Sequence, residues 1–479
     1  MKERIITGIL CLLLIGQFKA FSQPVNATRL TLKQCVDAAI KNNLLVRQSD
    51  LQMQAGGVNL NQAKSNLFPD LFANLNHGMN QGRSIDPFTN SYINQQIAFG
   101  SYSLNSSVVL FNGFQLKNLI KQNALTYEAN KMDLQQTKDN ITLNVILAYL
   151  QLLNSEEQLA QAKNQAEVTR SQVERLTVMN QSGAIPPAQL YDLKGQLAND
   201  ELAMVTSRNA LDAAKLSLAQ LMNTPYNGNL TVDKMTADTI SFGYDNDPRA
   251  LYNVSVKQLA IIKATELRRQ SALKEVQVAK GLRYPTINLT GSFNTNYSNA
   301  ASKDIPVGTV ETSSGDYVDI AGSKIPVMTK RTTFSSEKIS YGDQFKNNYN
   351  TSLYLSIQIP ILNNFRARNR VALAKIDLRN AEVVEQTAKT QLNQNIEQAY
   401  FNMTAALEKY KTLQQQVSDF SESFRTAEVR FNAGAITQVD YLIAKNNVDR
   451  SRANLISTKY DYLFRIKILD YYKNDLSLE

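Results

Sequence analysis

Few residues of this chain belong to the types that usually carry out catalysis or bind metal ions. The 479 residues include one histidine, His77, and two cysteines, Cys11 and Cys35. A histidine-based triad or a zinc site needs several such residues at defined spacings. The sequence also has no phosphate loop and no nucleophile elbow. We therefore expect a protein that is not an enzyme and that needs no metal and no cofactor.

The first residues have the pattern of a secretory signal. Lys2 and Arg4 precede an apolar run that is too short to span a bilayer, and small residues suited to cleavage follow it. Removal of residues 1–22 would leave Cys35 as the one thiol, which we expect to be buried in a helix as a small apolar residue. The net charge is +9, but basic and acidic residues alternate, so no nucleic-acid binding is expected.

Two very long stretches of the chain lack helix-breaking residues. After Gly113 no glycine or proline occurs until Gly183, and a second stretch of this kind ends at Gly434. At 1.5 Å per residue, each stretch predicts a helical rod of about 100 Å. Apolar residues recur every seven positions, as in long helices that pack side by side. We expect each rod to fold back at its glycine into an antiparallel hairpin, although a plain four-helix bundle or coiled-coil scaffold would show the same periodicity.

Four segments alternate apolar and polar residues, as half-buried strands do. They centre on Leu71–Leu75, Tyr102–Leu110, Ile287–Phe293 and Tyr349–Ile361. Each has about ten residues, which suits a tilted strand across a bilayer or an ordinary sheet on a soluble core. The polar stretches between them, His77–Gly100 and the longer Asn294–Asn348, are predicted to be surface loops, with His77 exposed.

The chain contains an internal repeat. Leu110–Phe114 matches Ile361–Phe365, which lies 251 positions later, and Gly183 matches Gly434 at the same spacing. Upstream the spacing is 216, from Pro69 to Pro285, because the second polar loop is longer. One unit of helix, strand, loop, strand, long helix, turn and helix therefore occurs twice.

The sequence predicts a mainly α chain with a smaller β part. The expected organisation is a signal peptide, 1–22; an N-terminal helix of the first repeat, 23–66; a first β-hairpin with its loop, 67–112; a first helical hairpin, 113–221; a linking segment, 222–253; a helix of the second repeat, 254–282; a second β-hairpin with a longer loop, 283–361; a second helical hairpin, 362–472; and a C-terminal tail, 473–479.

Taken together, these features resemble the TolC family of outer-membrane efflux proteins. The resemblance covers nearly all of the mature chain. It is carried by Pro69 and Pro285 before the strands, by the strand-to-helix corners Leu110–Phe114 and Ile361–Phe365, and by the turn sequence Phe431–Leu442. It implies a homotrimer in which four transmembrane strands per chain form a twelve-stranded barrel, continuous with an α-helical periplasmic tunnel. Four strands alone cannot close a barrel, and open edges are not tolerated in lipid.

The resemblance also implies a function and partners. The protein would be the outer-membrane exit duct of a tripartite efflux or type I secretion system, passing small molecules or polypeptides outward. A periplasmic adaptor protein and an inner-membrane transporter would be its partners. Aromatic belts would be formed by Tyr92, Phe99, Tyr102, Tyr284, Phe293 and Tyr297, since the chain has no tryptophan. The alternative is an exported coiled-coil scaffold or adhesion protein with a soluble sheet.

The resemblance places the channel constriction at the hairpin tips. Asp440, six residues after Gly434, matches an aspartate of the family's selectivity ring, and Asp192 is a second carboxylate near a tip. Phe431 stands where the family pattern has tyrosine, and Gln189 where it has aspartate. The family's polar latch is therefore not expected here, whereas the constriction is. The turns are the expected docking surface for the adaptor; they consist of Gly183, Ala184 and Ile185, and of Gly434, Ala435 and Ile436.

Overall fold

The structure is a computed structural model that describes residues 29–85, 90–94, 96–226, 228–234 and 247–475. The expected signal peptide with Cys11, part of the linking segment and the last residues of the tail lie outside these ranges. The chain forms two compact units, which we describe separately. The helical unit comprises Met1–Met53, Ala129–Thr265 and Glu385–Glu479, and the sheet unit comprises Gln54–Glu128 and Glu266–Val384.

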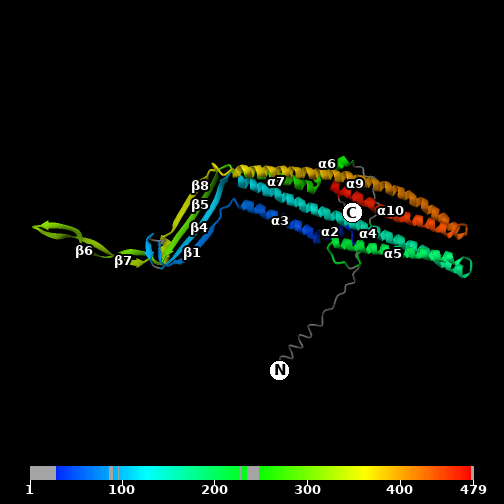
Figure 1. Cartoon of the computed structure of the whole chain (residues 1–479), viewed down its shortest axis with the longest axis horizontal. Coiled ribbons are helices and arrows are strands. Elements are labelled where there is room, and N and C mark those ends of the chain that lie inside the picture. The colour runs from blue at the N-terminus through cyan, green and yellow to red at the C-terminus, as the bar shows by residue number, and fades with distance from the viewer. Residues whose placement is uncertain (1–28, 86–89, 95, 227, 235–246, 476–479) are drawn as a thin grey trace, which may run out of the picture. The chain divides into compact units, whose positions relative to one another are not determined.

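Four long helices form the two expected hairpins (Figure 1). In the first, α4 (Gln115–Gln181) is followed by α5 (Pro187–Leu221), and in the second, α9 (Arg366–Asn432) is followed by α10 (Gln438–Lys473). Both α4 and α9 have 67 residues, and α9 begins 251 positions after α4. The prediction of long helices that end at Gly183 and Gly434 is confirmed, as is the mainly helical character of the chain.

The expected single N-terminal helix is wrong, because it is two helices. α2 (Leu32–Asn42) and α3 (Leu44–Ser65) are separated at Asn43, whose backbone is extended. The Asn43 side chain accepts the N–H of Leu45 at 2.8 Å and so caps the second helix. A short polar side chain that caps in this way competes with continuous helix.

The second repeat has the same break between α6 (Pro248–Gln258) and α7 (Ala260–Gly281). Each of these two helices begins 216 positions after its counterpart, α2 or α3. The expected boundary at residue 253 therefore falls inside a helix that belongs to the repeat. The proline at the first position of α6 is a helix-start signal in the sequence. The sequence prediction did not use the 216-residue spacing that relates the start of α6 to the start of α2.

The core of the helical unit brings together α2, α4, α5, α10 and the segment around Val232. Tyr149 on α4 is 2% exposed, and its hydroxyl donates to the carbonyl of Asp233 at 2.6 Å. Cys35 on α2 is fully buried, as expected, and burial raises the pKa of its thiol to about 11. The thiol therefore stays protonated at neutral pH and packs as an apolar group.

The sheet unit contains a four-stranded antiparallel sheet in the order β1-β4-β5-β8. The strands are β1 (Phe72–Asn80), β4 (Ile97–Asn112), β5 (Thr286–Ser298) and β8 (Asn350–Gln358). The register places apolar residues on one face, which include Leu75, Leu104, Val108, Ile287, Leu289, Phe293, Leu353, Leu355 and Ile357. Asn, Ser and Thr predominate on the other face. None of the four strands contains a charged residue.

The segments between these strands are more regular than the expected loops. The first contains the short pair β2 (Arg83–Ile85) and β3 (Tyr92–Asn94). The second is mainly a long hairpin of β6 (Ser302–Ile320) and β7 (Ser323–Lys338), followed by α8 (Tyr341–Asn347). Among the described strands, β6 and β7 pair only with each other (Figure 1). The expectation of an irregular surface loop was wrong. The Ser and Gly content of the segment suggested a loop, but its Val, Ile and Thr residues favour strands. The two strands are joined by a turn at Ala321 and Gly322, both at positive φ.

Within the described ranges, no helix is both long enough and apolar enough to cross a membrane.

Candidate gate at the hairpin tips

The two tip turns have the same backbone geometry. Gly183 and Gly434 have φ values of 72° and 74°, a conformation that glycine adopts without strain. The alanine after each glycine donates its N–H to a carbonyl five residues earlier, at 2.9 Å to Met179 and 2.8 Å to Arg430. These bonds close the last helical turn in the Schellman arrangement. Glycine and alanine are exposed in both turns, while the isoleucines that follow, Ile185 and Ile436, are half-buried.

The helices after the turns begin differently. α5 starts at Pro187 after Pro186 and has no side-chain cap. α10 starts with a capping box, in which the N–H of Asp440 donates to the Thr437 hydroxyl oxygen at 3.2 Å. The Asp440 carboxylate accepts the Thr437 N–H at 3.3 Å and the Thr437 hydroxyl at 2.7 Å. This structural role of Asp440 was missed, although Thr-x-x-Asp before an apolar run is a readable capping pattern.

Asp440 also lines an open groove between α9 and α10. The groove has a volume of about 720 Å³ and contains the carboxylates of Asp419, Glu422 and Asp440 together with Arg430. Asp440 is exposed, so its second carboxylate oxygen remains available to solvent. Glu422 is paired with Arg425 at 2.6 Å, so any attraction of the groove for cations or basic side chains depends on Asp419 and Asp440.

Phe431 takes part in an aromatic stack within the second hairpin. Its ring lies 4.7 Å from that of Tyr441, nearly parallel, and Phe424 contacts the same tyrosine at 5.6 Å. Tyr441 is 1% exposed, and burial raises the pKa of its hydroxyl to about 12. The loss of the family's tyrosine hydroxyl at Phe431 is therefore accompanied by apolar packing between α9 and α10.

The second predicted carboxylate, Asp192, is exposed near the start of α5. The neighbouring Leu193 is 1% exposed and packs with Leu176 and Leu190 in a small apolar cluster at this tip. Leu442 from α10 packs against the same cluster, so apolar contact joins the two tips.

Polar contacts also join the two tips. The Gln438 amide donates to the backbone carbonyl of Gln189 at 2.7 Å, and Arg175 donates to the side chain of Asn432. Gln189, where the resemblance placed an aspartate, thus contributes its backbone to this contact. These two contacts, together with the leucine cluster, join the hairpins at their tips.

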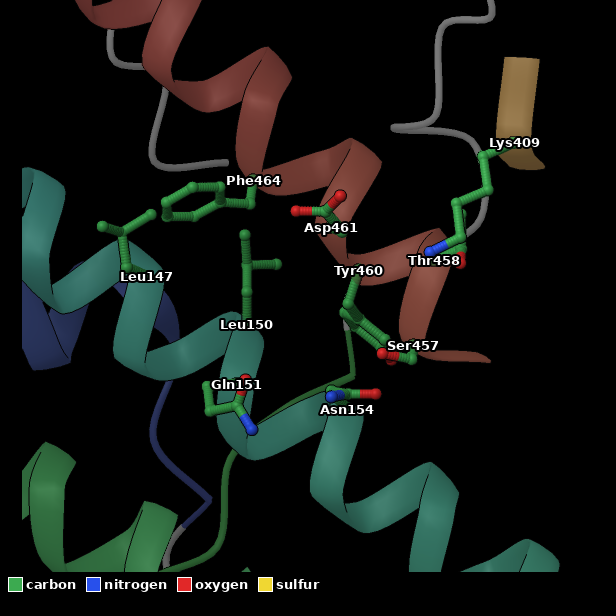
Figure 2. Close-up of a pocket in the computed structure, with 10 residues that line it drawn as sticks. All are labelled: Leu147, Leu150, Gln151, Asn154, Lys409, Ser457, Thr458, Tyr460, Asp461 and Phe464. Atoms are coloured by element: carbon green, nitrogen blue, oxygen red, sulfur yellow. The ribbon is translucent and has the colours of Figure 1, made fainter. Parts of the chain in front are cut away.

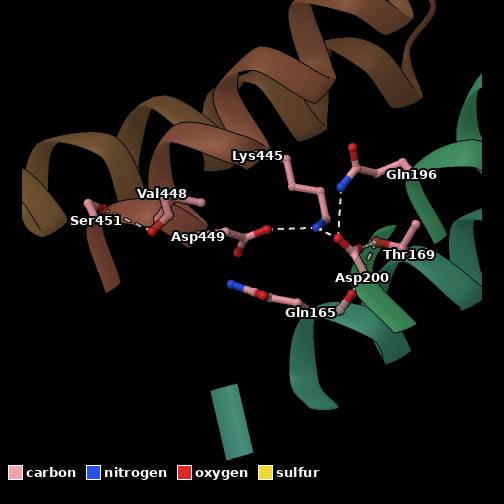
Figure 3. A network of polar contacts seen from close by, with 8 residues as sticks. All are labelled: Gln165, Thr169, Gln196, Asp200, Lys445, Val448, Asp449 and Ser451. Atoms are coloured by element: carbon pink, nitrogen blue, oxygen red, sulfur yellow. Dashed lines mark hydrogen bonds and ion pairs between the residues drawn. The ribbon is translucent and has the colours of Figure 1, made fainter. Parts of the chain in front are cut away.

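A buried ion network lies further along the same contact between the hairpins (Figure 3). Lys445 on α10 binds Asp200 on α5 at 3.0 Å and Asp449 one turn away at 2.7 Å. Thr169 and Gln196 donate to the two oxygens of Asp200 at 2.5 and 2.7 Å. The side chains of Lys445 and Asp200 are 3% and 9% exposed.

Sequence reasoning missed this network. Both residues of the ion pair lie at heptad positions that usually carry apolar side chains. A charged residue at such a position is the sequence signal that could have indicated a buried ion pair. Breaking a buried pair by removal of one partner costs roughly 3–5 kcal/mol, because the other charge is left uncompensated. Removal of Lys445 alone should therefore cost more stability than removal of one partner of an exposed ion pair.

A third contact, between α4 and α10, borders a cavity with a mainly polar lining. Lys459 and Tyr460 both donate to one oxygen of Glu157, at 2.7 and 2.8 Å. Burial and this bond to a carboxylate raise the pKa of Tyr460. A cavity of about 460 Å³ lies beside them, with Leu147, Leu150 and Phe464 on its apolar side and mainly polar groups elsewhere (Figure 2). The Asn154 oxygen there is buried without a partner among the described residues, which suits a site filled by water.

In the sheet unit, the predicted proline positions precede strands. Pro285 comes directly before β5, and Pro69 comes shortly before β1. Asp70 then fixes the start of the sheet, since its carboxylate accepts the N–H of Ser107 at 2.7 Å. Proline suits these positions because it has no N–H to offer to a neighbouring strand.

The strand-to-helix corners are also equivalent in the two repeats. Gly113 and Phe114 have positive φ, and so do Asn364 and Phe365 at the matching positions. A Cβ at Gly113 would lie 2.5 Å from the carbonyl oxygen of Gly281, so glycine is required there by close approach as well as by φ. The second corner tolerates asparagine, which adopts this conformation more readily than most residues.

Comparison with known proteins places this chain among outer-membrane channels. The family described as "Outer membrane efflux protein" matches residues 35–224 and 257–465. Outer membrane protein TolC of Escherichia coli (strain K12) is 23% identical over 466 residues, which cover 95% of this chain and 83% of that protein.

Solved structures of such channels have a similar fold. CusC, whose structures concern folding and transmembrane channel formation, matches with a TM-score of 0.75 at 15% identity, over 93% of this chain and 92% of that chain. The outer membrane protein VceC of Vibrio cholerae matches with a TM-score of 0.72 at 13% identity, over 93% and 97% of the two chains. The chain therefore belongs to the outer membrane efflux protein family, and it is an outer-membrane protein whose helical part lies in the periplasm.

Proposed function

We propose that the protein is the exit duct of a tripartite efflux or type I secretion system and that it works as a homotrimer. The observation that carries this proposal is the four-stranded sheet, which has one apolar face, no charged residue and two open edges, β1 and β8. An open edge leaves backbone groups unpaired, which lipid does not tolerate. Closure with further copies of the chain removes the edges.

The strand directions suit closure by a ring of copies. All neighbouring strands in the order β1-β4-β5-β8 are antiparallel, so β1 and β8 point in opposite directions. β8 of one copy can therefore pair with β1 of the next in the same antiparallel pattern. Three copies give twelve strands, and the apolar face then contacts lipid while the polar face lines the lumen.

The proposed lumen of the barrel is polar but uncharged. Ser292 and Ser352 share a hydrogen bond of 2.7 Å across β5 and β8, and Asn294 donates to Ser292 at 3.1 Å. Such a surface holds water and does not select solutes by charge. Selection by charge is therefore left to the helical tunnel, where we place the constriction at the tips.

Internal duplication supports the proposed tunnel. We propose that the chain arose by duplication, because α4 and α9 have equal length and α2, α3, α6 and α7 keep one constant spacing between repeats. Two similar hairpins per chain give a trimeric tunnel of alternating repeats. We keep the domain boundaries expected from the sequence as part of this proposal, except that the second repeat begins with α6 at Pro248.

At the tips, we place rings formed by three copies of the exposed carboxylates of Asp440 and Asp192. Closely spaced carboxylates favour cations in a narrow bore. Phe431 supports this constriction from within the second hairpin, through its stack on Tyr441. The exposed turns Gly183–Ile185 and Gly434–Ile436 are the proposed docking surface for a periplasmic adaptor, which connects the duct to an inner-membrane transporter.

Charge substitution on the two faces of β5 tests the barrel. Leu289 lies on the apolar face and its neighbour Asn288 on the polar face. Leu289→Arg is expected to block trimer assembly in the outer membrane, since an arginine at the bilayer midplane costs about 2–4 kcal/mol. Asn288→Arg is the matched control and should leave assembly intact.

The readout is the mass of the detergent-solubilised protein from purified outer membranes, measured by light scattering with correction for detergent. A trimer supports the proposal. A monomer that stays dispersed without detergent, with equal behaviour of the two variants, would instead support an exported coiled-coil scaffold.

A further inference from the structure

The short helix α8 lies on the apolar face of the sheet. The Thr295 hydroxyl on β5 donates to the backbone carbonyl of Phe345 at 3.2 Å. Thr295 comes two residues after Phe293, so its side chain is on the face that carries Phe293, Leu289 and Ile287. Thr295 is 1% exposed, because α8 covers it. In the proposed barrel, α8 therefore lies outside the wall, on the lipid side.

Gln344 fixes α8 to the sheet. Its side chain is 1% exposed, donates to the carbonyls of Ser298 and Ile339 at 2.9 Å, and accepts the N–H of Ser298 at 2.9 Å. A helix of seven residues has little stability of its own. These three bonds hold α8 in place at the end of β5, next to the base of the β6–β7 hairpin.

α8 presents two aromatic rings that the sheet covers only in part. Tyr341 and Phe345 are one helical turn apart, and they pack against Tyr297 and Tyr102 with centroid distances of 4.8 and 6.1 Å. Tyr341 nevertheless remains 49% exposed and Phe345 43% exposed. His77 joins the group, since its Nδ1 lies 3.2 Å from the Tyr102 hydroxyl. A tyrosine such as Tyr341, with an apolar ring and a polar hydroxyl, is typical of the boundary between lipid and water, and the Phe345 ring adds apolar area beside it.

The position of α8 along the strands fits that boundary. From Ile287 to Thr295 is eight residues, or about 26 Å along β5, and a tilt of about 40° reduces this to about 20 Å along the membrane normal. At the opposite end, beside the helices, Phe111 and Phe114 form a second aromatic pair with a centroid distance of 5.3 Å. The apolar band of such barrels is about 25 Å tall. α8 thus lies at its outward end.

We propose that α8 is an interfacial anchor, whose Tyr341 and Phe345 rings insert at the boundary between acyl chains and headgroups of the outer leaflet. The occupant of this surface is a lipid surface, because the aromatic pair adjoins the apolar face of the sheet through Tyr297 and Tyr102, and the charged Asp343 and Lys346 of α8 suit the headgroup side of that boundary. The inference rests on the proposed barrel. It assigns α8 the task of setting the depth of the barrel and of holding the β6–β7 hairpin above the membrane.

Single tryptophans test the proposal, because the chain has none of its own. Phe345→Trp reports on α8, Leu289→Trp on the middle of the apolar face, and Tyr317→Trp on the β6–β7 hairpin, where Tyr317 is 55% exposed. The purified trimers are reconstituted in vesicles that contain phosphatidylcholine brominated either near the headgroup or deep in the acyl chain. Fluorescence quenching by these lipids and by aqueous acrylamide is then measured.

The tryptophan at position 345 should be quenched most by the shallow bromines, the one at 289 by the deep bromines, and the one at 317 by acrylamide alone. The anchor is refuted if the tryptophan at position 345 is quenched by acrylamide alone, as at position 317. Quenching of the tryptophan at position 289 by the deep bromines would still show a barrel in lipid. If position 289 also shows no lipid quenching, the barrel itself is refuted, so the two failures are distinguishable. A further variant, Tyr341→Trp, should behave as Phe345→Trp does.

Discussion

The two helical hairpins share their geometry but not the side chains that secure it. Their first helices have equal length, and their turns have φ values within a few degrees of each other. Six residues after the glycine, however, the first hairpin has Gln189 and the second has Asp440, and only the second has a capping box. Backbone geometry at the tips is thus set by glycine and helix-end hydrogen bonds. The charge differs between the repeats, since at this matched position only the second repeat carries a carboxylate.

The contact between the hairpins shows a related asymmetry. At the tips it is made by leucines, by the Gln438 amide and by the Arg175–Asn432 bond, whereas further along it includes the buried pair Lys445–Asp200. If the contact at the tips is weaker than the contact around Lys445, the two tips can separate while the rods stay joined at Lys445. The predictions below test whether the two repeats, and these two levels of contact, differ as the structure indicates.

The largest expected effect is at the buried ion network. Lys445→Ala leaves Asp200 and Asp449 without their cation and should destabilise the helical unit by roughly 3–5 kcal/mol. The matched control is Arg425→Ala, since Arg425 pairs with Glu422 on an exposed face of α9 and its loss should have a much smaller effect. Thermal unfolding of the detergent-solubilised trimer, followed by circular dichroism, measures both. Equal losses would show that the buried pair has no special role.

The double variant Lys445→Met with Asp200→Leu sharpens the test. It removes the Lys445–Asp200 pair together and replaces it with apolar groups, so part of the stability should return, while Asp449, whose side chain is 16% exposed, remains without its cation. A double variant no more stable than Lys445→Ala would contradict the interpretation that an uncompensated charge causes the loss.

The second prediction concerns the turns, where the repeats should respond alike. Gly183→Ala and Gly434→Ala each force a Cβ into the left-handed region and should cost about 1–2 kcal/mol. Space is not the cause, since a Cβ at either position has no neighbour within 4 Å. Gly195→Ala in the interior of α5, where the added Cβ also meets nothing, should instead stabilise by about 0.5–1 kcal/mol. The same unfolding assay applies, and a loss at one turn alone would break the equivalence of the repeats.

Much of the fold followed from patterns that a single sequence displays. The uninterrupted rods, their heptads and the glycines at their ends specified the helical hairpins, because these signals are local. The break at Asn43 and the β6–β7 ribbon did not follow, since a capping asparagine and a Ser-rich strand look like continuous helix and loop until the partners are known. Asp200 and Lys445 are 245 residues apart, so their pairing depends on how two distant helices meet.

The same reasoning explains the mixed outcome at the tips. The positions of the turns were predictable, because positive φ favours glycine wherever it occurs. The exposure of Asp440 follows from its place in the first turn of α10, but its engagement with Thr437 required attention to a residue three positions earlier. Phe431 was expected to mark a lost hydroxyl, and its stack on Tyr441 became visible only with both helices in place.

The smallest expected stability effect separates the two roles of Asp440. Asp440→Asn removes the charge but keeps an oxygen that can accept the Thr437 N–H, so stability should change by no more than about 0.5 kcal/mol. Thr437→Ala removes the cap and keeps the charge, at a cost of about 1 kcal/mol. Reversal potentials of single channels in a salt gradient should shift toward lower cation preference for Asp440→Asn and stay unchanged for Thr437→Ala. An unchanged reversal potential for Asp440→Asn would mean that Asp440 serves the helix start alone. A remaining cation preference would then be assigned to Asp192 in the first repeat.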